Sequence, residues 1–386
     1  MSPIRLLAVD VLQTLLRVLP FPCRTGLVRI GHPDRSSPVL MTCNFRLTVE
    51  RVKRALRGID AYLLVANSRG VNVWCAATGG LFTNHDAISV LKTSGIEELV
   101  DHRRVILPQL AATGIEGPEI RRQTGWRVHW GPVEARDLPA FLRAGLETTP
   151  RMRRVSFPLP RRLEMAVAWA FPISLATLGV LPFWPESVLP LAALVWALSL
   201  SIFAAFPVYA RWLDGPRKHL GLLIFDLGQR GVPLLLWAGF SLGVAAWLAH
   251  AGDLSWGTWL RWSGSSLVIL AILSLDLMGS TPVYKSGLHG DRLLRIDLDP
   301  ALCKGAGFCE RVCPTNVFEM QPEGDLVTLP RKSQCVQCGA CIVQCPFDAL
   351  GFASPNGDRI PPDTIRRFKL NLMGERTVAA SKGDAA

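Results

Sequence analysis

The chain of 386 residues carries 42 Lys and Arg against 31 Asp and Glu, a formal net charge of +11. Only 19% of its residues are charged and 49% are hydrophobic, which excludes a disordered chain and argues against a purely soluble protein. At about 100–200 residues per domain, this length predicts two or three folded units.

The cysteines are unevenly placed, because seven of the ten fall between Cys303 and Cys345. A disulfide framework would need a secreted setting. The apolar N-terminal segment Ile4–Leu19 is interrupted by Asp10 and Arg17, which favours an amphipathic helix over a signal peptide. We therefore expect reduced thiolates that hold metal in a cytoplasmic compartment.

Residues 1–160 are expected to form a cytoplasmic α/β domain of Rossmann-like type. Short apolar runs predict buried strands, and the amphipathic stretches between them predict helices, an alternation typical of βαβ units with a mostly parallel sheet. The expected strands are Pro38–Thr42, Ala61–Val65, Val71–Trp74 and Arg104–Leu107, and the expected helices are Thr48–Leu56 and Asn84–Leu91. Thr83 and Asp86 predict a capping box at the start of the second helix.

Residues 161–285 are expected to form a transmembrane domain of about four helices, since four stretches approach the roughly 20 apolar residues that cross a bilayer. These stretches are Met165–Trp184, Val188–Tyr209, Val232–His250 and Ser263–Met278. A fifth apolar stretch, Leu220–Leu227, is too short to span and is interpreted as interfacial or re-entrant. Asp226 and Asp276 lie near the membrane, where a functional and an interfacial role are both open.

Basic residues gather on one side of these predicted spans. They occur in Arg151–Arg162 and in the loop Arg211–Arg230, whereas the opposite loops contain only Arg261. By the positive-inside rule, four crossings place the N-terminal domain and the C-terminal cysteines together on the cytoplasmic side of the inner membrane. The positive charge then reflects topology and contact with membrane lipids, and no nucleic-acid partner is expected.

Residues 286–353 are expected to form a bacterial-type α+β dicluster ferredoxin domain. The run Cys335-x2-Cys338-x2-Cys341-x3-Cys345-Pro346 is a complete iron–sulfur ligand pattern, in which the fourth cysteine binds the other cluster. A zinc ribbon is the alternative, since paired CxxC motifs also bind zinc. Seven cysteines and two Cys-Pro steps favour the ferredoxin, whose chemistry is one-electron transfer.

An alanine interrupts the earlier cysteine run, which reads Cys303-x2-Ala306-x2-Cys309-x3-Cys313-Pro314. Crossing of the ligands assigns one complete [4Fe–4S] cluster to Cys313, Cys335, Cys338 and Cys341. The other site is left with Cys303, Cys309 and Cys345. Since alanine cannot bind iron, we expect a [3Fe–4S] cluster there, with a water-ligated cubane as the alternative. The polar tail, residues 354–386, is expected to be loosely ordered.

A lone cysteine follows an apolar run in Gly70-Val71-Asn72-Val73-Trp74-Cys75-Ala76-Ala77. A lone cysteine is most often a packing residue, and spacing alone favours that interpretation. A cysteine between a strand and a helical segment can also be a metal ligand or a nucleophile.

The Asn72–Ala77 stretch resembles the cap-helix motif of the membrane corrinoid protein of the bacterial and archaeal mercury-methylation pair, Asn-Val-Trp-Cys-Ala-Ala-Gly-Lys-Gly. The resemblance extends through Ser37–Asn44, Val105–Leu110, Arg127–Pro139 and Met278–Pro282. In that family the partner is a separate dicluster ferredoxin, whereas here both parts share one chain. This sequence has Thr-Gly-Gly where the family has Gly-Lys-Gly, and no cysteine follows the last cluster motif, where the family's ferredoxin ends in an adjacent cysteine pair.

The resemblance implies a cobalamin-type corrinoid on the α/β domain, with the Cys75 thiolate as lower axial cobalt ligand and catalytic residue. Carried over by position, the cofactor-binding residues are Thr42, Asn72, Val73, Trp74, Cys75, Ala76 and Ala77. Co(I) would take a methyl group from a methyl-folate system or a methyl-donor protein, and methyl-Co(III) would pass it on, to Hg(II) in the known family members. The clusters, reduced by a low-potential electron donor, would return electrons to cobalt.

We therefore expect a membrane-anchored corrinoid and iron–sulfur fusion with methyltransferase chemistry. One alternative is a paralogue that methylates another acceptor in one-carbon metabolism. The other is a membrane-bound electron-transfer protein of ferredoxin type whose N-terminal domain holds no cobalt.

Overall fold

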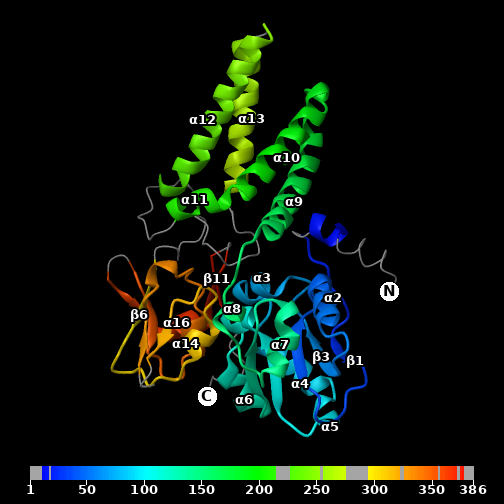
Figure 1. Cartoon of the computed structure of the whole chain (residues 1–386), viewed down its shortest axis with the longest axis vertical. Coiled ribbons are helices and arrows are strands. Elements are labelled where there is room, and N and C mark those ends of the chain that lie inside the picture. Colours follow the sequence, from blue (N-terminus) through cyan, green and yellow to red (C-terminus); the bar gives the residue numbers. More distant parts are fainter. Residues whose placement is uncertain are drawn as a thin grey trace. The chain divides into compact units, whose positions relative to one another are not determined.

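The computed structural model describes residues 11–16, 19–213, 227–252, 255–274, 294–321, 326–354, 357–371 and 374–377. The chain divides into two compact units, one built mainly from Phe157–Gly279 and the other from Leu19–Ser156 and Asp291–Ala386 (Figure 1). The first is called here the helical unit. The second contains an α/β region (residues 19–156) and a cysteine-rich region (residues 294–377), which therefore pack together as one body.

The α/β region contains a five-stranded sheet in the order β1-β3-β2-β4-β5. The strands are β1 (Gly26–Ile30), β2 (Val39–Cys43), β3 (Ala61–Ala66), β4 (Arg104–Pro108) and β5 (Arg127–Gly131). Strands β2 to β5 are parallel and β1 is antiparallel to β3, which confirms the predicted α/β class. The expected strands at β2, β3 and β4 are confirmed. Sequence reasoning missed β1 and β5, which lie at the sheet edges, because exposed arginines interrupt their apolar pattern.

Helices cover both faces of this sheet. They are α2 (Arg46–Ala55), α3 (Val73–Thr78), α4 (Asn84–Thr93), α5 (Ile96–Leu99), η1 (Gln109–Thr113), α6 (Gly117–Thr124), η2 (Ala135–Asp137), α7 (Leu138–Arg143) and α8 (Pro150–Arg153). Apolar residues of α3, α4 and α6 pack against one face of the sheet, and those of α2 and α7 against the other. The predicted capping box is confirmed, since the Thr83 N–H donates to Asp86 Oδ2 at 2.8 Å.

The expected strand Val71–Trp74 is wrong. Val71 lies in a loop and Asn72 is the N-cap of α3, because its Oδ1 accepts the Cys75 N–H at 3.0 Å. A side chain that satisfies a free N–H of the first turn stabilises a helix start by about 1 kcal/mol, which here outweighs the strand preference of two valines.

The helical unit contains paired long helices. Its elements are α9 (Leu159–Ala176), η3 (Thr177–Val180), η4 (Pro185–Ser187), α10 (Val188–Ala204), α11 (Phe206–Leu213), α12 (Leu227–His250) and α13 (Trp256–Ser274). Ser199 Oγ on α10 donates to the Ala166 carbonyl on α9 at 2.8 Å. The indole N–H of Trp237 on α12 donates to the Ser263 carbonyl on α13 at 2.7 Å.

Two helices of the described chain are long and apolar enough to cross a membrane, Leu159–Val180 with mean hydropathy 1.6 and Pro185–Ala204 with 2.1. Leu234–His250 is apolar but shorter. The four-helix transmembrane domain therefore stays a prediction. Asp226, Asp276, residues 4–10 and the stretch Met278–Pro282 lie outside the described residues.

The cysteine-rich region has short elements around its cysteines. They are β6 (Arg295–Leu298), α14 (Phe308–Val312), β7 (Glu319–Met320), β8 (Val327–Thr328), η6 (Lys332–Gln334), α15 (Ala340–Gln344), β9 (Leu350–Ala353), β10 (Arg359–Ile360), α16 (Pro362–Arg367), β11 (Phe368–Asn371) and β12 (Gly374–Thr377). One sheet has the order β10-β9-β6, β7 pairs with β8, and β11 pairs with β12.

The expectation of a loosely ordered tail after residue 353 is wrong for residues 359–371 and 374–377, which form β10, α16, β11 and β12. Ile365 is 8% exposed in the core of the cysteine-rich region. Arg366 Nη2 donates to the Cys345 carbonyl at 3.0 Å. Burial of a few apolar side chains and capping of the α15 end thus order a segment whose composition is mostly polar.

Candidate functional site

The carboxyl edge of the α/β sheet changes strand order between β2 and β4. The chain passes from β2 to its neighbour β3 on one side and then crosses to β4 on the other side of β2. Open α/β sheets bind ligands at such a switch point. The β2–β4 ladder contains only Val39 with Val105 and Leu40 with Ile106. Residues 41–43 of β2 are therefore not paired with β4, and the two strands part towards this edge.

Three buried polar atoms at this edge have no hydrogen-bond partner among the described residues. They are Thr42 Oγ1 near the end of β2, and Gln109 Oε1 and Thr113 Oγ1 on η1, which follows β4 directly. Their residues are 2%, 1% and 3% exposed. An unpartnered buried polar group costs about 1–3 kcal/mol, so each of these atoms favours a ligand that supplies the missing hydrogen bond.

Asn44 holds the loop that leads from β3 to α3. Its Oδ1 accepts the Ser68 N–H at 2.8 Å, the Ser68 hydroxyl at 2.9 Å and the Gly70 N–H at 3.0 Å. Gly70 has φ +74°, and a Cβ there would lie 2.4 Å from the backbone nitrogen of Pro22. The start of α3 is thus attached to the end of β2 by hydrogen bonds and a close backbone approach.

The short helix α3 gathers six of the seven predicted cofactor residues, Asn72 through Ala77. Ala76 and Ala77 are fully buried and Trp74 is 8% exposed, whereas Cys75 is half-buried. A Cβ on Gly114 would lie 2.8 Å from the Ala77 carbonyl oxygen. The small residues are therefore required where α3 packs beside η1, and Cys75 is left partly accessible.

Thr42 does not lie on the same face of the sheet as α3. Side chains alternate along a strand, so Thr42 lies on the face of Leu40, whereas Met41 and Cys43 pack on the face that α3 covers. A ligand that lies across the carboxyl edge can contact residues on both faces of the sheet. A ligand that lies against one face can contact that face alone.

Cys43 and Cys75 differ in burial. Cys43 is 0% exposed, and this burial raises the pKa of its thiol to about 11. It therefore stays protonated near neutral pH and serves as a packing residue. Cys75 is the accessible thiol, so it is the better candidate for a metal ligand.

The cysteine-rich region repeats one local structure twice. Helices α14 and α15 each follow a left-handed glycine, Gly307 with φ 71° and Gly339 with φ 74°. Each helix ends at a cysteine that is followed by a proline. Three positions after that cysteine, Asn316 and Asp348 both have a left-handed backbone with φ 53°. Ala306 precedes Gly307 as Cys338 precedes Gly339, so the alanine occupies the structural position of a ligand.

Two of the buried cluster cysteines have other cysteines as close neighbours. Burial raises the pKa of Cys341 well above its ordinary value, and Cys338, Cys335, Cys313 and Cys309 raise it further. Burial likewise raises the pKa of Cys309 to about 12, with additional effects of Cys345 and Cys303. The assignment of each cysteine to a cluster stays a prediction.

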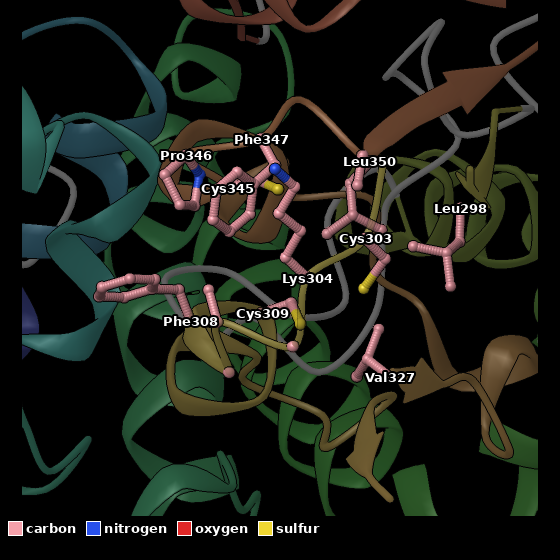
Figure 2. A pocket seen from close by; sticks show the side chains of 14 residues that line it. Leu298, Cys303, Lys304, Phe308, Cys309, Val327, Cys345, Pro346, Phe347 and Leu350 are labelled. Carbon is pink, nitrogen blue, oxygen red and sulfur yellow. The ribbon is translucent and has the colours of Figure 1, made fainter. Parts of the chain in front are cut away.

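Cys303, Cys309 and Cys345 line one cavity together with Ala306 (Figure 2). Lys304 Nζ lies 5.3 Å from the centre of the Phe347 ring at the same cavity. In the described residues, no three Cys, His, Asp or Glu side chains are arranged to hold a single metal ion. The cysteines of an iron–sulfur cluster bind different iron atoms and need not converge on one point.

Comparison with known proteins agrees with this division of the chain. Residues 17–142 match the family model of the CO dehydrogenase/acetyl-CoA synthase delta subunit, and residues 302–349 match the 4Fe–4S dicluster domain. The α/β region is thus of the corrinoid/iron–sulfur protein type, and it is joined to a 4Fe–4S dicluster domain in one chain.

Particular relatives match about a third of this chain. The acetyl-CoA decarbonylase/synthase complex subunit gamma of Methanopyrus kandleri is 39% identical over 125 residues, 32% of this chain and 27% of the relative. The corresponding subunit of Archaeoglobus fulgidus is 36% identical over 125 residues, which are 32% of this chain and 26% of the relative. The corrinoid/iron–sulfur protein large subunit of Moorella thermoacetica is 32% identical over 130 residues, which are 33% of this chain and 29% of the relative. The chain thus spans about a quarter of the length of these relatives, and kinship with the mercury-methylation pair in particular stays a prediction.

Sequence reasoning missed Gln109 and Thr113 as site residues. Gln109 lies within the stretch Val105–Leu110 that carried the family resemblance, which was the one available signal. Nothing in the sequence distinguishes a polar residue with an unpartnered buried atom from one at the surface.

Proposed function

We propose that this chain binds a corrinoid at the carboxyl edge of its α/β sheet and performs corrinoid-dependent methyl transfer, with its cysteine-rich region supplying electrons to the cobalt. The observation that carries the proposal is that Gln109 and Thr113 on η1, which packs beside the helix of Cys75, and Thr42 near the end of β2 each keep a buried polar atom unpartnered among the described residues. The match to corrinoid/iron–sulfur proteins supports it.

The residues present fit such a group. A corrinoid ring carries amide side chains that both donate and accept hydrogen bonds, which suits two hydroxyls and an amide oxygen that lack partners in the described structure. A bound corrinoid supplies transfer of a methyl group through its cobalt. The Cys75 thiolate would bind the cobalt, and Val73, Trp74, Ala76 and Ala77 with the N-cap Asn72 form the helix that would hold it there.

The protein's own contribution is to position that thiol. Asn72 fixes the Cys75 N–H, and Asn44 fixes the loop before it. Trp74, Ala76 and Ala77 are buried, so the helix cannot turn to present another side chain. Cys43 does not compete for the metal, because its buried thiol stays protonated.

Seven thiolates are proposed to hold two iron–sulfur clusters. Cys313, Cys335, Cys338 and Cys341 would hold a [4Fe–4S] cluster, and Cys303, Cys309 and Cys345 a [3Fe–4S] cluster, because Ala306 offers no fourth ligand.

We also propose a multi-pass location in the inner membrane, with the α/β and cysteine-rich regions in the cytoplasm. These two regions pack into one unit although the helical segment separates them in sequence. They must therefore lie on the same side of a membrane, which requires an even number of crossings. Four crossings satisfy this condition and the distribution of basic residues.

The partners follow from the chemistry. The methyl group would come from a methyl-donor protein or a methyl-folate system, and electrons from a low-potential donor. The Asn72–Ala77 sequence supports Hg(II) as acceptor, giving methylmercury. The curated relatives named as subunits of acetyl-CoA decarbonylase/synthase complexes support an acceptor in one-carbon metabolism instead.

The deciding measurement is the ultraviolet–visible spectrum and the cobalt-to-iron ratio of the full chain, purified without oxygen and supplied with corrinoid. Wild type and the control Cys23→Ala, which alters another half-buried cysteine, should bind cobalt with the same spectrum. Cys75→Ala should shift that spectrum. If the wild type contains iron but no cobalt, the proposed methyltransferase function is overturned and the electron-transfer alternative is favoured.

The acceptor is tested in cells exposed to Hg(II). Methylmercury formed by cells with the wild-type chain and lost with Cys75→Ala supports mercury as the acceptor. A cobalt-loaded chain that forms none contradicts mercury and favours the one-carbon acceptor.

A further inference from the structure

Gln344, the last residue of α15, reaches from the cysteine-rich region into the α/β region. It is 1% exposed. Its Nε2 donates to the carbonyls of Ala112 at 2.8 Å and Ile115 at 2.6 Å, and its Oε1 accepts the Gly117 N–H at 3.1 Å. The amide N–H groups and the amide oxygen of this side chain are thus bonded to backbone atoms of η1 and of the segment that follows it.

Apolar contacts surround this hydrogen-bonded contact. Val312 of α14 and Ala340 of α15 are 1% and 2% exposed and belong to the core of the α/β region, which includes Ala112 and Ile115. Cys338, one of the four cysteines assigned to the complete cluster, packs against the same core. The two regions therefore share a core at this point.

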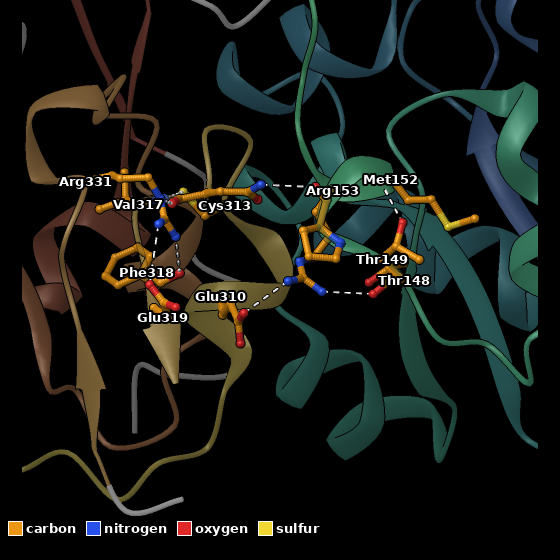
Figure 3. A network of polar contacts seen from close by, with 12 residues as sticks. Thr148, Thr149, Met152, Arg153, Glu310, Cys313, Val317, Phe318, Glu319 and Arg331 are labelled. Carbon is orange, nitrogen blue, oxygen red and sulfur yellow. Dashed lines mark hydrogen bonds and ion pairs between the residues drawn. The ribbon is translucent and has the colours of Figure 1, made fainter. Parts of the chain in front are cut away.

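A second contact joins the segment after the α/β sheet to α14 and the turn that follows it (Figure 3). Arg153 Nη2 pairs with Glu310 Oε1 at 3.0 Å. The Val155 N–H donates to the Pro314 carbonyl at 2.8 Å, and Asn316 Nδ2 donates to the Pro150 carbonyl at 3.0 Å. Pro314 directly follows Cys313, so this contact also adjoins the four-cysteine set.

We propose that these contacts form an intramolecular electron-transfer dock. Gln344 fixes the cysteine-rich region against η1, and the packing of Cys338 on the α/β core makes the four-cysteine cluster the immediate electron donor to the cobalt. The inference rests on the proposed function. Gln344 bonds to Ala112 of η1 and to the segment that follows it, and η1 also carries the unpartnered atoms of Gln109 and Thr113. The cavity of Cys303, Cys309 and Cys345 is lined by the cysteine-rich region alone.

The step is a transfer of one electron. The reduced cluster of Cys313, Cys335, Cys338 and Cys341 loses one electron, and the cobalt gains it, with no transfer of a proton or a group. A low-potential one-electron donor protein reduces the cluster again. Because electron-transfer rates fall steeply with distance, a fixed dock makes the nearer cluster the donor.

Amide hydrogen exchange of the full chain tests the dock without any cobalt. Gln344→Leu should speed exchange of the Gly117 amide, which donates to Gln344, at least about tenfold, since buried partners are left unsatisfied. Gln344→Glu keeps an acceptor for Gly117 but cannot donate to Ala112 or Ile115, so it should give an intermediate effect. Gln334→Leu, an exposed glutamine of the same region, is the control. Equal exchange in Gln344→Leu and Gln334→Leu overturns the dock.

The order of the clusters is tested by electron paramagnetic resonance of the corrinoid-loaded chain. On addition of a low-potential electron donor, the Co(II) signal should be lost in the wild type and in Cys309→Ser, because the cobalt takes up the electron. The signal should persist in Cys341→Ser and be lost more slowly in Gln344→Leu. A signal that persists in Cys309→Ser and is lost in Cys341→Ser overturns the assignment. A wild type that binds no cobalt contradicts the proposed function instead, while the exchange measurement still decides whether the dock exists.

Discussion

Arg153 and Glu310 form an ion pair of 3.0 Å between α8 and α14, with side chains 11% and 28% exposed. Arg153 also donates to the Thr148 carbonyl at 2.9 Å. Its own carbonyl accepts the side-chain N–H of Gln109 at 3.0 Å. One residue therefore links the cysteine-rich region to the edge where Gln109 leaves its amide oxygen unpartnered among the described atoms.

Breaking this ion pair should uncouple the two regions. Because the pair is largely buried, Arg153→Met and Glu310→Gln should each destabilise the protein, with a coupling energy of about 1–2 kcal/mol in a double-mutant cycle. Urea unfolding of the single and double variants measures it. Strictly additive effects would show that the ion pair contributes nothing.

Thr42→Val should affect stability and corrinoid binding in opposite directions. Valine has the shape of threonine without the hydroxyl, whose oxygen has no partner in the described structure. The corrinoid-free protein should gain about 1 kcal/mol of stability, and corrinoid should bind more weakly because one hydrogen bond is lost. Unfolding midpoints and a corrinoid titration check both effects. Thr93→Val, on the exposed surface of α4, should leave corrinoid affinity unchanged, and equal affinity in Thr42→Val would remove Thr42 from the site.

Ala306→Cys should complete the second cluster. The alanine lines the cavity of Cys303, Cys309 and Cys345, and it occupies the position that Cys338 has in the repeat. Iron should rise from about seven to about eight atoms per chain, and the paramagnetic signal of an oxidised three-iron cluster should disappear. Ala301→Cys adds an exposed thiol nearby and should change neither. An eight-iron wild type would refute the three-iron assignment.

His129 should make the stability of the unit sensitive to acid. Burial lowers the pKa of His129 below its ordinary value of 6.5, and the charges of Arg104, Arg127 and Arg311 lower it further. A lowered folded-state pKa means that the unfolded chain takes up the proton first. The contribution to stability is therefore present above pH 6.5 and is lost as the pH falls towards the folded-state pKa.

Replacement of His129 tests this dependence. His129→Gln should reduce the decrease of the urea midpoint between about pH 7.5 and about pH 5.5, whereas His85→Gln, on the surface of α4, should not. An unchanged pH dependence in His129→Gln would mean that other groups govern the acid sensitivity.

Short-range patterns in the sequence determined much of this protein. Apolar runs identified β2, β3 and β4, and the Thr83–Asp86 spacing identified a helix start. The cysteine spacing predicted two sets of thiols, and the structure brings Cys303, Cys309 and Cys345 to one cavity. Such patterns succeed because each involves residues a few positions apart, whose geometry the local backbone determines.

The tertiary structure alone decided the rest. It placed Asn72 as a helix cap within a run that reads as a strand, and it left Thr42, Gln109 and Thr113 buried with unpartnered atoms in the described part of the chain. It also brought Gln344 to the carbonyl of Ala112, 232 residues away. A buried hydrogen bond over that separation depends on how the packed layers meet, and no local pattern in the sequence carries that information.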